Sequence, residues 1–146
     1  MKKSLTLAAV AIFFAVSSFA SPVTGPDNKK AVEVFSKVFA NAESVKWEEN
    51  SKFISASFQL HGAYLSAHFS PAAELIGVSR NITSSQLPLH LFAQLKKHYS
   101  NYWITELFEY ATKDSDSYYV TLENSDQVLI LKGDSNGFTT YKKTNK

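Results

Sequence analysis

The chain contains no cysteine among its 146 residues. This excludes a disulfide framework, and it excludes the acylated cysteine by which a bacterial lipoprotein is anchored. The folded part must therefore be held together by its hydrophobic core alone. A chain of this length can bury a core of sufficient size.

Long apolar runs are missing beyond the first twenty residues. Lys2 and Lys3 precede an apolar run over residues 5–19, and Ser18-Phe19-Ala20 supplies small residues of the kind that a signal peptidase reads. The run is about 15 residues long, shorter than the roughly 20 residues of a membrane-spanning helix. We expect residues 1–20 to be a signal peptide cleaved near Ala20. The mature protein should be periplasmic or secreted, with no transmembrane segment.

The mature chain also lacks an excess of charge of either sign. The whole sequence has 15 Lys and Arg against 13 Asp and Glu. Lys2 and Lys3 are the only charged residues of 1–20, so 13 of each sign remain after cleavage. Because the lysines are scattered among acidic residues and form no stripe, we expect no nucleic-acid partner.

Patterns that carry chemistry are missing too. No Gly-x-Ser-x-Gly nucleophile elbow occurs. None of the four histidines (His61, His68, His90 and His98) has a second histidine or cysteine at metal spacing. The segments 114–116 and 134–137 contain pieces of a calcium loop, but Asp, Ser, Asn and Gly are also ordinary turn formers. We expect no enzyme, no metal site and no cofactor.

What the chain does contain is one pattern that occurs twice. Residues 21–28 predict a flexible segment, in which Asp27 or Asn28 caps a helix that runs from Lys29 to about Asn41. A second helix opens at Leu87-Pro88 and has an apolar stripe at Leu91, Phe92, Leu95 and Tyr99. Four strands are predicted after each helix, at 45–49, 53–60, 63–69 and 75–80, and then at 103–111, 117–123, 127–132 and 138–142.

Turn chemistry predicts the register of both central hairpins. A two-residue turn at His61-Gly62 places Ile54, Ala56 and Phe58 opposite Phe69, Ala67 and Leu65 on an apolar face. The other face pairs Ser55, Ser57 and Gln59 with His68, Ser66 and Tyr64, and we expect it to be solvent-exposed. A turn at Ser125-Asp126 pairs Leu122 with Leu129 and Val120 with Leu131 in the same way, while Glu123, Thr121 and Tyr119 face Val128, Ile130 and Lys132.

These equivalences predict an internal duplication. Sheet positions match at an offset of 64 residues and helix positions at an offset of 60. Each unit has an apolar sheet face that one helix covers only partly, so the two units should share one continuous antiparallel sheet. We expect an α+β fold: one domain over 29–143, built from two tandem α-β-β-β-β repeats (29–82 and 84–143) in a continuous antiparallel sheet with the helices on one face.

Several short segments resemble the PepSY-like family of small secreted proteins, described as β-lactamase-inhibitor-like. They are Val34-Phe35 with Phe39-Ala40-Asn41-Ala42, Val45-Lys46-Trp47, Ser55-Ala56-Ser57-Phe58, Leu87-Pro88, and Tyr119-Val120-Thr121-Leu122. The resemblance covers residues 29–143 and implies helices on one face of an antiparallel sheet, in exported proteins of unassigned role. One departure is visible. Asp134-Ser135-Asn136-Gly137 fits the family's turn before the last strand of a repeat, whereas Ser70-Pro71-Ala72-Ala73 lacks its glycine.

Aromatic side chains outside the core-facing sets (Phe53, Tyr64, Tyr119 and Tyr141) indicate either a binding surface or cross-strand pairs that only stabilise the sheet. We expect an exported, non-enzymatic binding protein whose exposed sheet face holds an envelope or secreted protein or peptide through Tyr64, His68, Tyr119 and Ile130. The alternative is a carrier or sensor of a small apolar ligand, held between sheet and helices near Phe35, Phe58 and Leu95.

Overall fold

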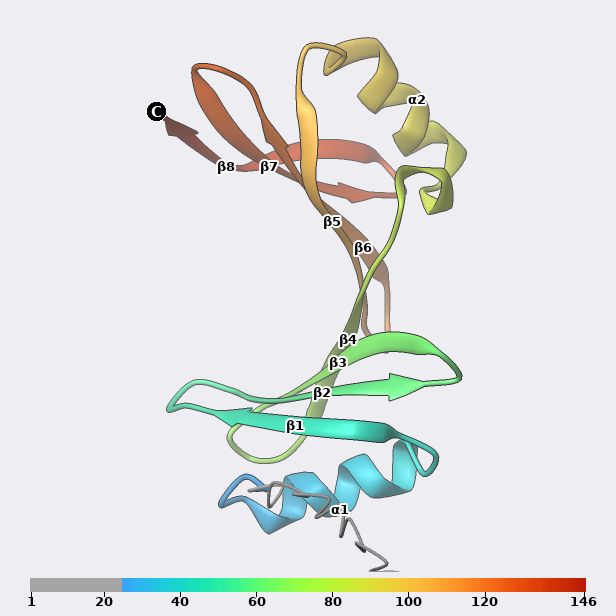
Figure 1. Ribbon diagram of the computed structural model, residues 1–146, viewed down its shortest axis with the longest axis vertical. Coiled ribbons are helices and arrows are strands. Elements are labelled where there is room, and N and C mark those ends of the chain that lie inside the picture. The colour runs from blue at the N-terminus through green and yellow to red at the C-terminus, as the bar shows by residue number, and fades with distance from the viewer. Residues whose placement is uncertain (1–24) are drawn as a thin grey trace, which may run out of the picture.

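The computed structural model describes residues 25–146 and contains one eight-stranded antiparallel sheet with the strand order β1-β2-β3-β4-β5-β6-β7-β8 (Figure 1). The strands are β1 Glu43–Glu49, β2 Ile54–Leu60, β3 Ala63–Phe69, β4 Leu75–Asn81, β5 Trp103–Ala111, β6 Asp116–Glu123, β7 Gln127–Asp134 and β8 Gly137–Asn145. The predicted α+β fold with a continuous antiparallel sheet is confirmed. The predicted signal peptide lies outside the described residues, as do residues 21–24 of the predicted flexible segment.

The two helices are α1, Lys29–Val38, and α2, Leu89–His98. Asn28 caps α1 as predicted, because its Oδ1 accepts the backbone N–H of Ala31 at 3.3 Å. The predicted end at Asn41 is wrong by three residues. The backbone leaves the helical conformation at Phe39, whose N–H still donates to the carbonyl of Phe35. A single 3₁₀ turn, Ser84–Gln86, precedes α2.

The register of both central hairpins is as predicted. In the first, Phe58 faces Leu65, Ala56 faces Ala67 and Ile54 faces Phe69. In the second, Leu122 faces Leu129 and Val120 faces Leu131. The first turn consists of His61 and Gly62, with φ angles of 50° and 81°. Both angles are positive, as the two-residue hairpin turn that matches strand twist requires.

Each repeat has its own core on the same face of the sheet. In the first repeat, α1 inserts Phe35 against Trp47 and Phe58, with ring centroids 5.1 and 5.0 Å apart. In the second, α2 contributes Leu91 and Leu95 to a core with Val120 and other buried residues of β5–β7. Figure 1 shows α1 beside β1 at one end and α2 above β5–β8 at the other. Within residues 25–146 the β4–β5 ladder alone joins the two halves of the sheet, over Val78–Asn81 and Phe108–Ala111.

The turn that lacks glycine keeps a left-handed backbone. Ala73 has a φ of 65° and is buried, and its N–H donates to the carbonyl of Ser70 at 2.8 Å. An alanine in this conformation costs about 1–2 kcal/mol. The departure noted in the sequence is therefore a side-chain substitution at a turn whose backbone still takes a conformation that favours glycine.

Ala56→Asp tests the register directly, since Ala56 is fully buried between Ile54 and Phe58. A carboxylate there would be buried without a partner, at a cost of several kcal/mol against a typical total stability of about 5–15 kcal/mol. We expect this variant to be unfolded by circular dichroism. The neighbouring substitution Ser57→Asp, on the opposite face, should fold normally because Ser57 is exposed and its register partner is Lys46. Normal folding of both variants would contradict the register.

Candidate binding groove

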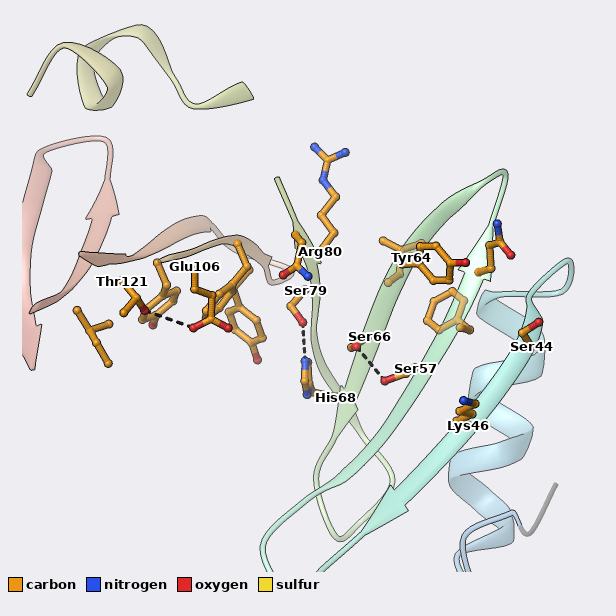
Figure 2. Close-up of a pocket in the computed structure, with 18 of the residues that line it drawn as sticks. Ser44, Lys46, Ser57, Tyr64, Ser66, His68, Ser79, Arg80, Glu106 and Thr121 are labelled. Atoms are coloured by element: carbon orange, nitrogen blue, oxygen red, sulfur yellow. Dashed lines mark hydrogen bonds between the residues drawn. The ribbon is translucent and has the colours of Figure 1, made fainter. Parts of the chain in front are cut away.

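The sheet face opposite the helices forms an open groove with a volume of about 1010 Å³, to which all eight strands contribute (Figure 2). Tyr64, His68, Tyr119 and Ile130, the residues expected from the sequence to bind a partner, all line it. The structure thus brings together side chains from β3, β6 and β7 that are up to 66 residues apart in the sequence. The groove exists because the helices occupy only the other face of the sheet.

The first repeat contributes small polar side chains to the groove. The Ser57 and Ser66 hydroxyls are 3.1 Å apart, and His68 Nε2 lies 2.9 Å from Ser79 Oγ. Figure 2 shows these two pairs on neighbouring strands, with Lys46 beside them on β1. Short side chains leave the sheet surface open here, so a bound molecule could come close to it. They also offer hydroxyl groups that can both donate and accept hydrogen bonds.

The second repeat contributes large aromatic side chains. Phe108 and Tyr119 are stacked with ring centroids 5.1 Å apart and an interplanar angle of 11°. Tyr141 meets Tyr119 edge-on at 5.7 Å, and Lys132 Nζ lies 5.9 Å from the centre of the Tyr119 ring. We call Phe108, Tyr119 and Tyr141 the aromatic cluster. Tyr141 is 66% exposed, so the cluster ends in a side chain that is open to contact.

Strand register allows the two repeats to be compared position by position. On the buried face, Ala56 is equivalent to Val120 and Phe58 to Leu122, and all four are apolar. On the groove face the equivalent pairs differ in character: Ser55 and Tyr119, Ser66 and Ile130, Glu48 and Phe108, and Lys46 and Glu106. These central buried positions are apolar in both repeats, whereas these four groove positions differ in character. At one of these positions the first repeat has a basic residue, Lys46, and the second an acidic one, Glu106.

His68 lies near the middle of the groove. Its ring centroid is 5.8 Å from that of Tyr110, whose ring covers Gly77; a Cβ on Gly77 would lie 2.6 Å from Tyr110 Cζ. Glycine at this position thus lets the Tyr110 ring approach the β4 backbone closely. Burial lowers the pKa of His68 from its ordinary 6.5. Burial, together with Tyr119, raises the pKa of Tyr110.

Charged groups lie on both faces of the sheet. On the face that carries the helices, Arg80 Nε on β4 lies 2.5 Å from Glu109 Oε2 on β5, and the Tyr118 hydroxyl donates to the same carboxylate at 3.3 Å. Burial raises the pKa of Tyr118, and the nearby Glu109 carboxylate raises it further. Glu106 accepts a hydrogen bond from Thr121 at 3.3 Å. Lys46 and Glu106 therefore place opposite charges in different halves of the groove.

Several sequence expectations differ from what the structure contains. Ser55, expected on a solvent-exposed face, is buried between register partners with longer side chains, Glu48 and His68. Phe53 is exposed but does not line the groove. Residues on β4 and β5 that do line it were missed: Ser79, Arg80, Glu106, Phe108 and Tyr110. The alternation of Glu106, Phe108 and Tyr110 along β5 is the signal that could have identified three of them.

The space expected for an apolar ligand between sheet and helices is largely filled. Phe58 contacts Phe35 and Phe39, with ring centroids 5.0 and 4.8 Å apart. Near Leu95 the structure has a small cleft of about 120 Å³, bordered by Phe92, Tyr99 and other residues. Among residues 25–146, no three His, Cys, Asp or Glu side chains are grouped as metal ligands would be, and no helix is long and apolar enough to cross a membrane.

Tyr64 is 76% exposed at the rim of the groove, and this predicts a small effect on stability when the ring is removed. We expect Tyr64→Ala to change the free energy of unfolding by less than about 1 kcal/mol in a urea titration. Tyr118→Ala is the contrasting variant and should cost more, because Tyr118 packs against the second core and bonds Glu109. A large loss with Tyr64→Ala would assign that ring to the core.

The lowered pKa of His68 predicts a pH dependence of stability. The neutral ring is favoured in the folded state, so the unfolded chain binds more protons as the pH falls through 6.5. This contribution is complete above about pH 7 and is lost as the pH falls from the unfolded pKa to the folded one. The urea midpoint should therefore fall more between pH 7.5 and pH 5 for the parent than for His68→Gln. Equal pH dependence in both proteins would show that His68 is not desolvated.

Comparison with known proteins shows the fold and no closer relationship. No family model matches the chain, and no curated protein matches it. A BLIP-like protein from Bacteroides fragilis NCTC 9343 has a similar structure, with a TM-score of 0.68 and 18% identity over 82% of this chain and 86% of that one. A presumed periplasmic protein from Bacteroides eggerthii DSM 20697 has a TM-score of 0.70 and 15% identity, over 83% and 88% of the two chains. A DUF2874 family protein from Bacteroides ovatus ATCC 8483 has a TM-score of 0.70 and 17% identity, over 84% and 88%. The chain therefore has a BLIP-like fold.

Proposed function

We propose that this chain is an exported, non-enzymatic binding protein and that its groove holds a protein or peptide partner. The observation that carries the proposal is the difference between the repeats. Both repeats keep apolar residues at central buried positions, Ala56 and Val120 and likewise Phe58 and Leu122, whereas the second repeat alone presents an aromatic cluster, Phe108, Tyr119 and Tyr141, to the groove. Folding requires the buried faces to be apolar but makes no such demand on the groove face. Selection for binding explains why the second repeat alone carries aromatic side chains at these groove positions.

The chemistry of the groove suits a macromolecular partner. Tyrosine and phenylalanine provide a large contact area and are enriched in protein interfaces, where a few such residues carry most of the binding energy. The groove is open along the sheet, and its volume of about 1010 Å³ is at the upper end of small-molecule pockets. The opposite charges of Lys46 and Glu106 would orient a bound segment. Cross-strand aromatic pairing also stabilises a sheet, but it does not require the exposure of Tyr141.

The solved neighbours agree with this proposal at the level of fold. One is described as BLIP-like and another as presumed periplasmic. Fold similarity does not transfer inhibitory activity, because function depends on the side chains of the site. The alternative, a carrier of a small apolar ligand, has less support because Phe35, Phe39 and Phe58 fill the expected space. The small cleft near Leu95 offers room for little more than a few atoms.

Affinity capture from a cell-envelope extract, read by mass spectrometry, tests the proposal. The bait is residues 21–146, the chain without its predicted signal peptide, and the groove variant is Tyr119→Ala with Tyr141→Ala. Loss of two contact residues worth about 2 kcal/mol or more should reduce affinity for a captured partner at least about thirtyfold. Leu89→Ala is the matched control, since Leu89 is 82% exposed on α2 and lies outside the groove.

A partner that is enriched by the parent and by Leu89→Ala but lost with the groove variant supports the proposal. A partner captured equally by all three proteins contradicts it. The single substitution Tyr141→Ala provides a second groove variant in case removal of Tyr119 disturbs the sheet, because the Tyr141 ring is mostly exposed. Its thermal midpoint should match that of the parent.

A further inference from the structure

The sheet leaves two edge strands, β1 and β8, at opposite ends of the molecule (Figure 1). Each presents backbone N–H and C=O groups that no further strand pairs within residues 25–146. Such edges are templates for pairing with another chain unless they are protected. β8 is exposed from Thr139 to its end, and all of β1 is at least partly exposed.

The internal duplication supplies a precedent within the molecule. The two repeats are joined by antiparallel pairing of the last strand of the first, β4, with the first strand of the second, β5. In the duplicated arrangement β8 is the equivalent of β4, and β1 is the equivalent of β5. Pairing of β8 from one molecule with β1 of the next would repeat the same joint between molecules.

The residues of the internal joint have counterparts at the free edges. Ser66 on β3 and Ile130 on β7 are equivalent, and their strand partners are Ser79 and Lys142. The residues that follow these partners, Arg80 and Lys143, therefore correspond to each other. Ile54 on β2 and Tyr118 on β6 are equivalent as well. Their partners on the preceding strands are Glu49 and Glu109, so these two glutamates correspond to each other. The ion pair between Arg80 and Glu109 that crosses the internal joint therefore has a basic and an acidic counterpart, one on each free edge.

The net charges of the two edges are opposite as well. β1 carries Glu43, Glu48 and Glu49 against a single Lys46, whereas β8 carries Lys142 and Lys143 and no acidic residue. Charges on edge strands commonly prevent aggregation, and here like charges would oppose β1–β1 and β8–β8 pairing. They would not oppose β8–β1 pairing. Glu49 already accepts the N–H of Asp27 at 2.9 Å, but a carboxylate has further acceptor positions.

We propose that this chain associates with copies of itself head to tail, by antiparallel pairing of β8 in one molecule with β1 in the next, in the register of the β4–β5 joint. Lys143 of one copy then pairs with Glu49 of the other. The contact joins two different surfaces, so it forms either a closed ring or an open chain. One strand pair is a small interface, so association should be weak and should decrease with salt. The proposal does not depend on what the groove binds.

Sedimentation velocity of residues 21–146 over a concentration series at low ionic strength tests the proposal. The parent should show a mean mass that rises with concentration above that of one chain. Lys143→Glu places two acidic residues opposite each other in the joint and should weaken association at least tenfold. Adding Glu49→Lys to that variant reverses both charges and should restore it. A mixture of the two single variants should associate more strongly than either alone.

Lys97→Glu makes the same change of net charge on the exposed face of α2 and should behave like the parent. Three results would overturn the proposal: a parent that stays a single chain at all concentrations, a loss of association with Lys97→Glu equal to that with Lys143→Glu, or failure of the double charge reversal to restore association. Circular dichroism of each variant establishes that the fold is intact. Both substituted edge positions are exposed, so no loss of folding is expected.

Discussion

The antiparallel pairing of β4 with β5 is the interaction on which the rest of the structure depends. Each repeat has its own helix and its own buried core, and in the described residues the ladder from Val78–Asn81 to Phe108–Ala111 joins the two halves of the sheet. Because of this ladder the molecule has one sheet face free of helices, and therefore one groove. The ion pair between Arg80 and Glu109 lies across this ladder.

A duplicated fold gives an internal control for separating structural from functional requirements. Positions that pack against a helix must be apolar in both repeats, and Ala56, Phe58, Val120 and Leu122 show this. Groove positions have no such requirement, and there Ser55 and Ser66 of the first repeat are replaced by Tyr119 and Ile130 in the second. The comparison needs only this one chain, because strand register fixes which residues are equivalent.

The parts of the fold that were predictable are those set by local pattern. Alternation and a two-residue turn determine the register of the β2–β3 hairpin, because a shift by one residue would expose Ile54, Ala56 and Phe58. The groove was predictable only where it uses those hairpins, as at Tyr64 and Tyr119. The part lined by β4 and β5 depends on pairing between residues about 30 apart, and no turn specifies that pairing. Tyr110 over Gly77 is an example, since only the β4–β5 pairing brings these two residues together.

Strand pairing at the sheet edges and binding in the groove use different parts of the sheet. Pairing at β1 or β8 uses backbone groups in the plane of the sheet, whereas the aromatic cluster projects from its surface. A strand added at either edge would therefore extend the sheet without filling the groove. It would instead place the groove of one copy beside that of the next, so that a partner with repeated binding segments could contact several copies at once. Weak contacts at each groove would then combine into a higher overall affinity.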